Sequence, residues 1–200
     1  MKAPLKVGIT GGIGSGKSTA CRIFETLGIP VYYADQRAKQ LMVEDARLRR
    51  EITGIFGEAA YLPDGQLNRA YIAEKAFSDK ALLQKLNAAV HPAVARDSLT
   101  WHEAQSGIPY TLKEAALLYE SGAHASLEQI IVVTAPEAIR LQRVMQRDGV
   151  DEAAVRARMA QQMPEAEKVK RAHFILHNNG RQSLIRQIIQ IHRSLQTIHL

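Results

Sequence analysis

Hydrophobic residues recur in two different rhythms along this 200-residue chain. Short apolar runs with strand character occur near both ends, whereas the stretch from residue 36 to residue 107 repeats its apolar positions at helical spacing. We expect strands at 5–10, 29–33, within 110–118, at 129–135 and within 173–180. Strands that flank a helical block predict an α/β fold with a parallel core and an all-helical insertion.

Local signals predict where the helices begin and end. In the helical block we expect helices at 37–42, 47–56, 68–76, from Ser78 or Asp79 to about 90, and from His91-Pro92 to about 104. Asn68 is a plausible N-cap for the third of these helices. After the fourth strand, Pro136 is expected to open a helix that runs through Arg147. Two further helices are expected at 150–163 and 182–195.

The segment VGITGGIGSGKSTA, residues 7–20, has the pattern of a phosphate-binding loop. The pattern G-x-x-x-x-G-K-[ST] has this meaning only between a strand and a helix, and the flanking hydrophobic periods predict both. Its glycines allow a close backbone approach, and its amides point at the ligand from the helix N-terminus. Lys17 would reach the β- and γ-phosphates of a nucleotide, and the Ser18 hydroxyl would hold Mg²⁺. The expected nucleotide-binding residues of the loop are Gly12, Gly14, Ser15, Gly16, Lys17, Ser18 and Thr19.

Carboxylates follow two of the expected strands. Asp35 comes after the second strand, at the sheet edge where ligands of open α/β sheets bind. It could accept the proton of an attacking hydroxyl, or it could be a helix N-cap, and the sequence favours neither. Glu114 ends the next strand and is a candidate second carboxylate near the metal, whereas Glu120 is expected to be solvated or capping.

Arginines recur after the fourth strand. Arg140, Arg143 and Arg147 share one helix face because they are three and four residues apart, and Arg156 and Arg158 follow in the next helix. Guanidinium groups of this kind close over a polyphosphate and neutralise developing charge in phosphoryl transfer. The alternative is a solvated face paired with Glu137 or Asp148. The phosphate loop favours the first interpretation.

Composition narrows the function classes. Lys and Arg number 26 against 20 acidic residues, a formal charge of +6 that suits an anionic partner. Because the basic residues are dispersed, we expect no nucleic-acid partner. Cys21 is the only cysteine, so no internal disulfide can form, and His173 and His177 lie in an expected strand, so they do not form a zinc pair. No apolar run reaches membrane-span length, and we expect a soluble cytoplasmic protein, as a monomer or a small homo-oligomer.

Six segments, in this order and spacing, resemble dephospho-coenzyme A kinase. They are TGGIGSGKST (10–19), LGIPVYYADQRAK (27–39), LNAAVHPAV (86–94), KEAALLYESG (113–122), RLQRVMQRDG (140–149) and NNG (178–180). The loop is common to many kinases, but the full set is specific and covers nearly the whole chain. The resemblance implies that ATP phosphorylates the ribose 3′-hydroxyl of dephospho-CoA, with Mg²⁺, to give CoA and ADP in the last step of coenzyme A synthesis. It implies a P-loop kinase core of five parallel strands with helices on both faces, at residues 1–35, 108–139 and 164–200, a helical substrate lobe at 36–107 and a helical lid at 140–163.

The resemblance also implies roles for single residues. Asp35 matches the second acid of the family's D-x-D pattern and is the implied base, Arg143 and Arg147 match lid arginines, and Asn179 and Gly180 match a segment near the adenine. His91 and Arg96 are the implied substrate-lobe contacts. The chain departs from the family pattern at Tyr33, which replaces the first Asp, and at Glu114 and Ala116, which stand where an Asp-x-Pro is usual. Tyrosine is not a base at neutral pH without a strong perturbation, so Tyr33 shifts that role to Asp35.

Three other functions compete with this interpretation. A kinase for another small hydroxyl acceptor would differ mainly in the helical insertion. A nucleotide switch would need a guanine-reading Asn-Lys-x-Asp motif, which the chain lacks. A nucleic-acid-binding ATPase is suggested only by the positive charge, and its binding would be strongly salt-dependent.

Overall fold

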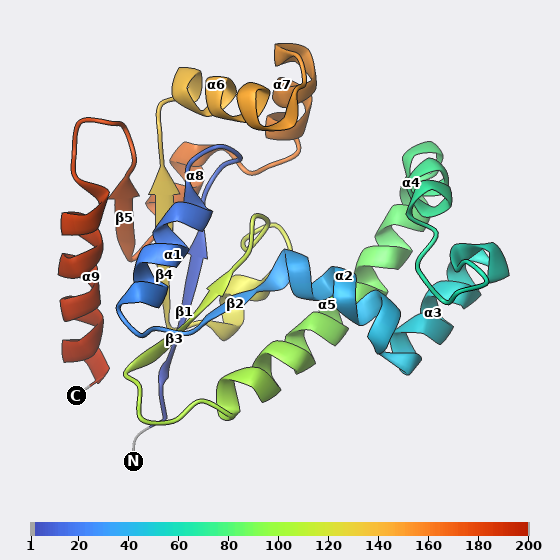
Figure 1. The fold of residues 1–200 in the computed structure, drawn as a ribbon, viewed down its shortest axis with the longest axis horizontal. Helices are drawn as coiled ribbons and strands as arrows, with labels where there is room; N and C mark the ends of the chain where they lie inside the picture. Colours follow the sequence, from blue (N-terminus) through green and yellow to red (C-terminus); the bar gives the residue numbers. More distant parts are fainter. Residues whose placement is uncertain (1–2, 200) are drawn as a thin grey trace. The chain divides into compact units, whose positions relative to one another are not determined.

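The strands form one parallel sheet. The computed structural model describes residues 3–199 except for the side chain of Phe77; residues 1, 2 and 200, at the ends of the expected core, lie outside the described residues. The strands are β1 (Leu5–Thr10), β2 (Val31–Tyr33), β3 (Tyr110–Glu114), β4 (Gln129–Thr134) and β5 (Phe174–His177). Their order is β2-β3-β1-β4-β5, and every neighbouring pair is parallel (Figure 1). The predicted parallel α/β core is therefore confirmed.

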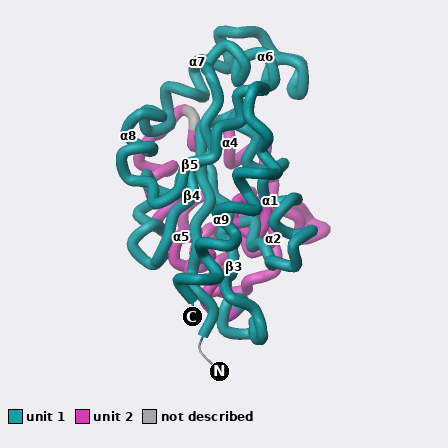
Figure 2. The backbone as a smooth tube through the Cα atoms, turned by 90° about the vertical axis from the view of Figure 1, so that its left-hand side faces the viewer, with its two compact units in different colours: residues 1–33, 101–200 teal, residues 34–100 magenta. Residues whose placement is uncertain are grey.

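The chain divides into two compact units, coloured separately in Figure 2. The first, here called the core unit, contains residues 1–33 and 101–200 and holds the whole sheet. The second, here called the helical unit, contains residues 34–100 and has no strand among its described residues apart from a single β-bridge between Tyr61 and Leu67.

Helices cover both faces of the sheet in the core unit. On one face, α1 (Lys17–Thr26) and α9 (Leu184–His199) share a buried cluster with the central strands. On the other face, α8 (Glu165–Lys170) packs beside β4 (Figure 2). Phe24 meets Tyr110 edge to face at 6.4 Å between ring centroids, and both rings are fully buried. Burial of each large apolar side chain of this kind contributes about 1.5–3 kcal/mol to the stability of the fold. The part of the core beneath the phosphate loop is therefore rigid.

The helical unit is built from capped helices. They are α2 (Ala34–Glu44), α3 (Ala46–Phe56), the 3-10 helix η1 (Glu58–Ala60), α4 (Arg69–Ser78) and α5 (Lys80–Glu103), whose residues 101–103 belong to the core unit. Asn68 caps α4 as predicted, because its side chain accepts the Tyr71 amide. Asp79, the second of two expected caps, accepts the Ala81 amide at the start of α5. Within this unit, Arg37 of α2 donates both its Nε and one terminal nitrogen to Asp97 of α5, at 2.9 and 3.0 Å.

The predicted helix boundary at His91-Pro92 is wrong. Pro92 lies inside α5, which continues for 24 residues. A proline in a helix interior removes one backbone hydrogen bond and crowds the preceding turn, so the sequence favoured a break. The structure overrides this preference because Val90 and Val94, on either side of the proline, are both buried.

The remaining elements lie between β3 and β5. They are the 3-10 helix η2 (Ala123–Ser126), α6 (Glu137–Asp148) and α7 (Glu152–Ala160). The helix expected at 150–163 is thus shorter, and the following α8 was not predicted, since six residues carry too little periodicity to be recognised. In the described part of the chain, no helix combines the length and apolarity needed to cross a bilayer.

Candidate active site

The phosphate loop connects the central strand β1 to α1, so the predicted strand–loop–helix arrangement is confirmed. Gly14 and Gly16 have φ of 79° and 97°, in the left-handed region that favours glycine. A Cβ atom at Gly16 would overlap the side-chain amide of Asn178, and one at Gly14 would collide with the backbone of Arg140. These two positions therefore need glycine for both conformation and space.

The loop presents groups that suit an anion. The Lys17 ammonium donates to the Gly11 carbonyl at 3.0 Å, which holds it over the loop. Ser18 and Thr19 place exposed hydroxyls in the first turn of α1, where no acidic residue opposes a negative ligand. The hydroxyl oxygen of Ser15 is buried, and no hydrogen-bond partner was found for it within residues 3–199. A polar atom left in this way beside a helix N-terminus fits a bound phosphate.

The first half of α6, here called the base, lies directly on the loop. Arg143 donates to the carbonyls of Gly14 at 3.3 Å, Ser15 at 3.5 Å and Asn178 at 3.3 Å. Arg140 is only 9% exposed, and its guanidinium lies where a Cβ atom of Gly12 would be. Two of the predicted arginines therefore contact the loop directly.

Arg140 is neutralised by a carboxylate that the sequence analysis did not identify. Its Nε lies 3.4 Å from Glu165 Oε2 and donates to the Ala135 carbonyl at 3.1 Å. The other oxygen of Glu165 accepts a short hydrogen bond from the Thr134 hydroxyl at the end of β4. This chain of contacts fixes Arg140 at the carboxyl edge of the sheet.

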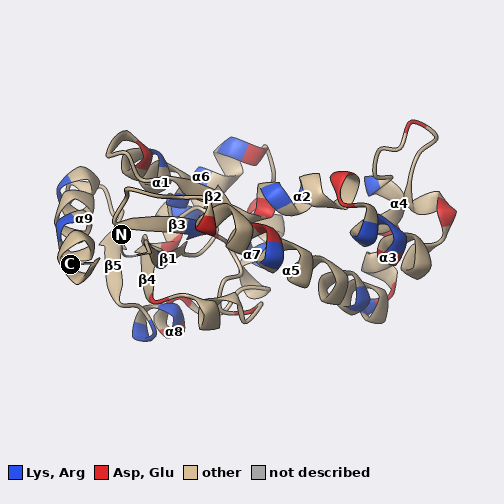
Figure 3. Cartoon of the chain, turned by 90° about the horizontal axis from the view of Figure 1, so that it is seen from below, with Lys and Arg blue, Asp and Glu red and all other residues tan. Residues whose placement is uncertain are grey.

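α6 and α7 form a helical hairpin, and its arginines beyond the base, Arg147, Arg156 and Arg158, are here called the tip arginines, although Arg156 reaches back to Glu137, the first residue of α6. Arg147 and Arg158 both pair with Asp148, at 2.7 and 2.8 Å. Arg156 pairs with Glu137 and Glu152, each at 2.7 Å. These three arginine side chains are 48–64% exposed, and Figure 3 colours the basic and acidic residues along the ribbon. The structure thus places the tip arginines in surface ion pairs and brings only the base arginines to the loop.

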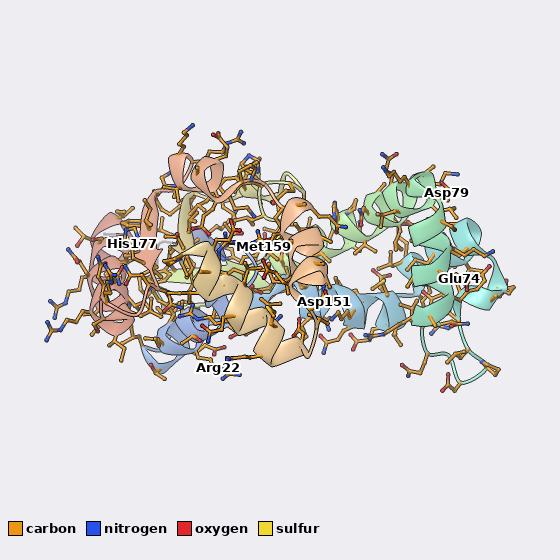
Figure 4. All side chains as sticks on the ribbon, turned by 90° about the horizontal axis from the view of Figure 1, so that it is seen from above. Arg22, Glu74, Asp79, Asp151, Met159 and His177 are labelled. Carbon is orange, nitrogen blue, oxygen red and sulfur yellow. The ribbon has the colours of Figure 1, made fainter. Side chains whose placement is uncertain are left out.

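A cavity of about 360 Å³ lies between the loop, the hairpin and α8. Its lining includes Gly12, Glu137, Arg140, Met159, Gln162 and Glu165. Met159 comes from the last turn of α7, and Asp151 precedes the start of that helix, as labelled in Figure 4. Gly12 is the phosphate-loop residue in this lining, so the cavity lies beside the loop.

The carboxylates after β2 and β3 differ in burial. Glu114 is only 8% exposed at the end of β3, in register with Ile9 of β1. Asp35 is exposed in the first turn of α2, one residue after that helix begins, so it stands inside the helix and not at the N-cap. Burial, together with the nearby Cys21 and Glu25, raises the pKa of Tyr33 above its usual value, so Tyr33 is neutral at physiological pH.

The expected substrate residues lie on the helical unit. His91 and Arg96 are both exposed on α5, five residues apart, which separates them by about 140° around the helix. Partial desolvation lowers the pKa of His91, so its imidazole is neutral at pH 7. Arg96 lies 3.9 Å from Asp45 within the same unit.

The segment after β5 contacts the phosphate loop through Asn178. Asn178 donates its side-chain amide to the Ser15 carbonyl at 2.8 Å. The Asn179 side chain instead accepts the amides of Arg181 and Gln182, in a turn where Gly180 has φ of 77°. Asn178, the first residue of the NNG motif, therefore makes the loop contact, and the adenine contact expected of Asn179 and Gly180 stays a prediction.

Glu120 is exposed, as expected, but its side chain also makes contacts that the sequence did not predict. It pairs at 2.8 Å with Lys168, whose side chain is 0% exposed, and it accepts the Met163 amide at 2.7 Å. Burial alone would raise the pKa of Glu120, but the hydrogen bonds from Lys168 and Met163 lower it below its ordinary value. The sequence showed no sign of this pair because Lys168 lies in the helix that was not predicted.

Comparison with known proteins covers nearly the whole chain. The model of the dephospho-CoA kinase family matches residues 5–183. A curated dephospho-CoA kinase from Salinibacter ruber is 43% identical over 176 residues, which are 87% of this chain and 88% of the relative. A crystal structure from Thermus thermophilus has a TM-score of 0.84 and 36% identity, with 96% of this chain and 98% of that chain covered. The structure of a dephospho-CoA kinase from Campylobacter jejuni has a TM-score of 0.72 and 26% identity, with 97% and 98% covered.

Proposed function

Because this chain belongs to the dephospho-CoA kinase family, we propose that it transfers the γ-phosphate of ATP to the ribose 3′-hydroxyl of dephospho-CoA, giving CoA and ADP. The observation that carries this proposal is the phosphate loop with Arg140 and Arg143 packed on it, inside a family match that extends from residue 5 to residue 183. The loop alone supports nucleotide binding, and the extent of the match supports the acceptor.

ATP is the phosphate donor in this proposal. The amides at the start of α1 and the Lys17 ammonium would receive the β- and γ-phosphates, and the unpartnered Ser15 hydroxyl would gain an acceptor. Arg143 already lies on the loop carbonyls, so its positive charge needs little movement to reach a phosphate. Charge that develops on the transferred group would therefore be met by groups that are already oriented.

Mg²⁺ fits the oxygen donors at this edge. The Ser18 hydroxyl and the Glu114 carboxylate are hard oxygen ligands on α1 and on the end of β3, next to β1 in the sheet. Within residues 3–199, no group of three or more His, Cys, Asp or Glu side chains could hold a metal ion. Mg²⁺ usually binds through one or two protein ligands together with phosphates and water. When bound, the ion would offset phosphate charge.

Asp35 is the proposed general base that accepts the proton of the acceptor hydroxyl. It follows β2 by two residues, at the carboxyl end of that strand, and its carboxylate is exposed to a ligand. It would accept the proton of the 3′-hydroxyl as the oxygen attacks in line. Tyr33 does not share this task, because its raised pKa keeps the phenol protonated. His91 and Arg96 remain proposed substrate contacts of the helical unit, and Asn179 and Gly180 a proposed adenine contact.

The decisive experiment measures ADP formation from ATP and Mg²⁺ with and without dephospho-CoA, and the product mass. We expect strong stimulation by the acceptor and a product heavier by one phosphate. Lys17→Ala serves as the control, since it should abolish turnover and leave the protein folded. Stimulation by a different hydroxyl compound, with none by dephospho-CoA, would keep the kinase and reject this acceptor.

The role of Asp35 is tested separately with Asp35→Asn. The amide retains the shape of the carboxylate but cannot take a proton, so ATP binding should persist while transfer falls. Transfer at the wild-type rate would reduce Asp35 to a favourable charge in the first turn of α2.

A further inference from the structure

The apex of the phosphate loop is held from outside at Ile13. The Ile13 amide donates to the side-chain oxygen of Gln162 at 2.8 Å. The Ile13 side chain packs against the buried cluster of Leu141, Val144 and Val155 between α6 and α7. Backbone and side chain of one loop residue are therefore both fixed by the hairpin and the segment that follows it.

Gln162 is itself well placed to act as an anchor. The backbone amide of Gln162 donates to the Met159 carbonyl at 3.0 Å, and this hydrogen bond extends the end of α7. The next residue, Met163, donates its amide to Glu120, and Glu120 is paired with the buried Lys168. The backbone around Gln162 is thus tied to a buried ion pair in the core unit.

We propose that Gln162 is a positioning residue for ATP, which holds the loop apex in the shape that receives the phosphates. This inference rests on the proposed function only in taking ATP as the ligand of the loop. A loop that is already ordered loses less conformational entropy on binding, so its anchor contributes to affinity without touching the ligand. The Ile13 amide stays with Gln162 when ATP binds, since the amides at the N-terminus of α1 remain for the phosphates.

The neighbouring Gln161 provides a matched control. It is the same residue type one position earlier and is exposed, whereas Gln162 is half-buried. Gln162→Met keeps the length of the side chain but removes the acceptor, and Gln161→Met makes the same chemical change on the surface. The pair separates the hydrogen bond to Ile13 from a general effect of the substitution.

The test titrates the full-length proteins with a non-hydrolysable ATP analogue by calorimetry. We expect Gln162→Met to bind about five- to tenfold more weakly, the effect of one lost hydrogen bond, and Gln161→Met to bind within about twofold of the wild type. Unchanged or tighter binding by Gln162→Met would overturn the proposal, and tighter binding would mean that Gln162 competes with phosphate for the amide. This readout needs no acceptor, so it decides the question even if dephospho-CoA is not the substrate.

A kinetic measurement distinguishes positioning from a general loss of structure. In Gln162→Met, KM for ATP should rise by the same factor while kcat at saturating ATP changes by less than about twofold. A fall in kcat with unchanged KM would contradict positioning. Should the variant not fold, hydrogen exchange of the wild-type Ile13 amide replaces it: protection without nucleotide supports the anchor, and free exchange refutes it.

Discussion

The base and the tip of the α6–α7 hairpin carry arginines in similar sequence surroundings but in different environments. Arg140 and Arg143 at the base contact the phosphate loop and the groups behind it. Arg147, one turn beyond Arg143 on the same helix face, pairs with the adjacent Asp148, and Arg156 pairs with Glu137 and Glu152. Helical spacing alone put three of these side chains on one face, but the distance from the loop decides which of them meets a ligand-binding group.

The base and tip arginines differ in how far their charges are removed from water. At the base, guanidinium groups are buried or half-buried and donate to backbone carbonyls, where hydrogen bonds to a charged group are worth about 1.5–3 kcal/mol. At the tip, the pairs are exposed, and water and salt screen them. Three substitutions in the hairpin test this difference, and a fourth, Glu120→Ala, tests a buried charge outside the hairpin; we order them from the largest expected effect to the smallest.

Arg143→Ala at the base should lower turnover about a hundred- to thousandfold. The substitution removes a preorganised positive charge from the loop, and such groups carry effects of this size in phosphoryl and acyl transfer. Initial rates at saturating ATP give the measurement. Arg143→Lys is the control, since it keeps the charge without the planar fork and should recover only part of the activity. A loss smaller than threefold in Arg143→Ala would remove the distinction between base and tip.

Glu120→Ala should lower the free energy of unfolding by about 3 kcal/mol, since it leaves the Lys168 ammonium buried without its carboxylate. Urea denaturation at pH 7 measures this. Glu120→Gln, which keeps an acceptor for Lys168, should cost less.

Acid should weaken the same pair in the wild type. Because the folded-state pKa of Glu120 is lowered, its contribution is fully present above the ordinary carboxyl pKa of 4.5 and disappears as the pH falls through the lower folded value. The stability difference between wild type and Glu120→Ala should therefore shrink below pH 4.5. A difference that grows in acid would contradict the lowered pKa.

Arg147→Ala at the tip should lower turnover about tenfold and leave thermal stability unchanged. Arg147 would have to leave Asp148 to reach a phosphate, and that exchange reduces its net contribution. Asp148 still has Arg158 as a partner in the variant. Equal losses in Arg147→Ala and Arg143→Ala would show that the tip acts like the base, and wild-type turnover would leave Arg147 as a surface charge.

Arg156→Ala should change neither turnover nor melting temperature measurably. Both of its ion pairs are about half exposed, and exposed pairs of this kind contribute little to stability. Thermal unfolding at low and high salt and a standard activity assay give the comparison. A clear drop in activity would indicate that Arg156 leaves its ion pairs with Glu137 and Glu152 to contact a ligand.

The sequence predicted the features that depend on local patterns. The phosphate loop, the five strands and the caps at Asn68 and Asp79 each have a signal within a few residues, and the structure contains them all. The loop contact of Asn178 has no such signal, because nothing in the local sequence shows that its side chain reaches the Ser15 carbonyl.

The features that sequence reasoning missed depend on contacts between distant residues. Gln162 was expected within a helix at 150–163 and Glu165 in no element, and only folding brings them to Ile13 and Arg140. Lys168 carries no local signal of burial, yet it is fully buried and pairs with Glu120, 48 positions earlier. The prediction at Pro92 was wrong for the opposite reason. A strong local signal for a helix break was overridden by packing on both sides of the proline.

The order of strands in the sheet has a consequence for biosynthesis. β1 is made before the other four strands of the sheet, but its neighbours in the sheet are β3 and β4. Val7 can therefore pair on both sides only after Leu112 and Gln129 have been made. Until β3 has been made β1 has no partner strand, and until residue 134 has been made one of its edges stays unpaired in the growing chain. Residues 34–100 form their compact unit from neighbouring sequence alone and do not face this delay. Non-local pairing of this kind slows folding and prolongs exposure to aggregation, so the nascent chain should depend on chaperones most while its first strand is still single.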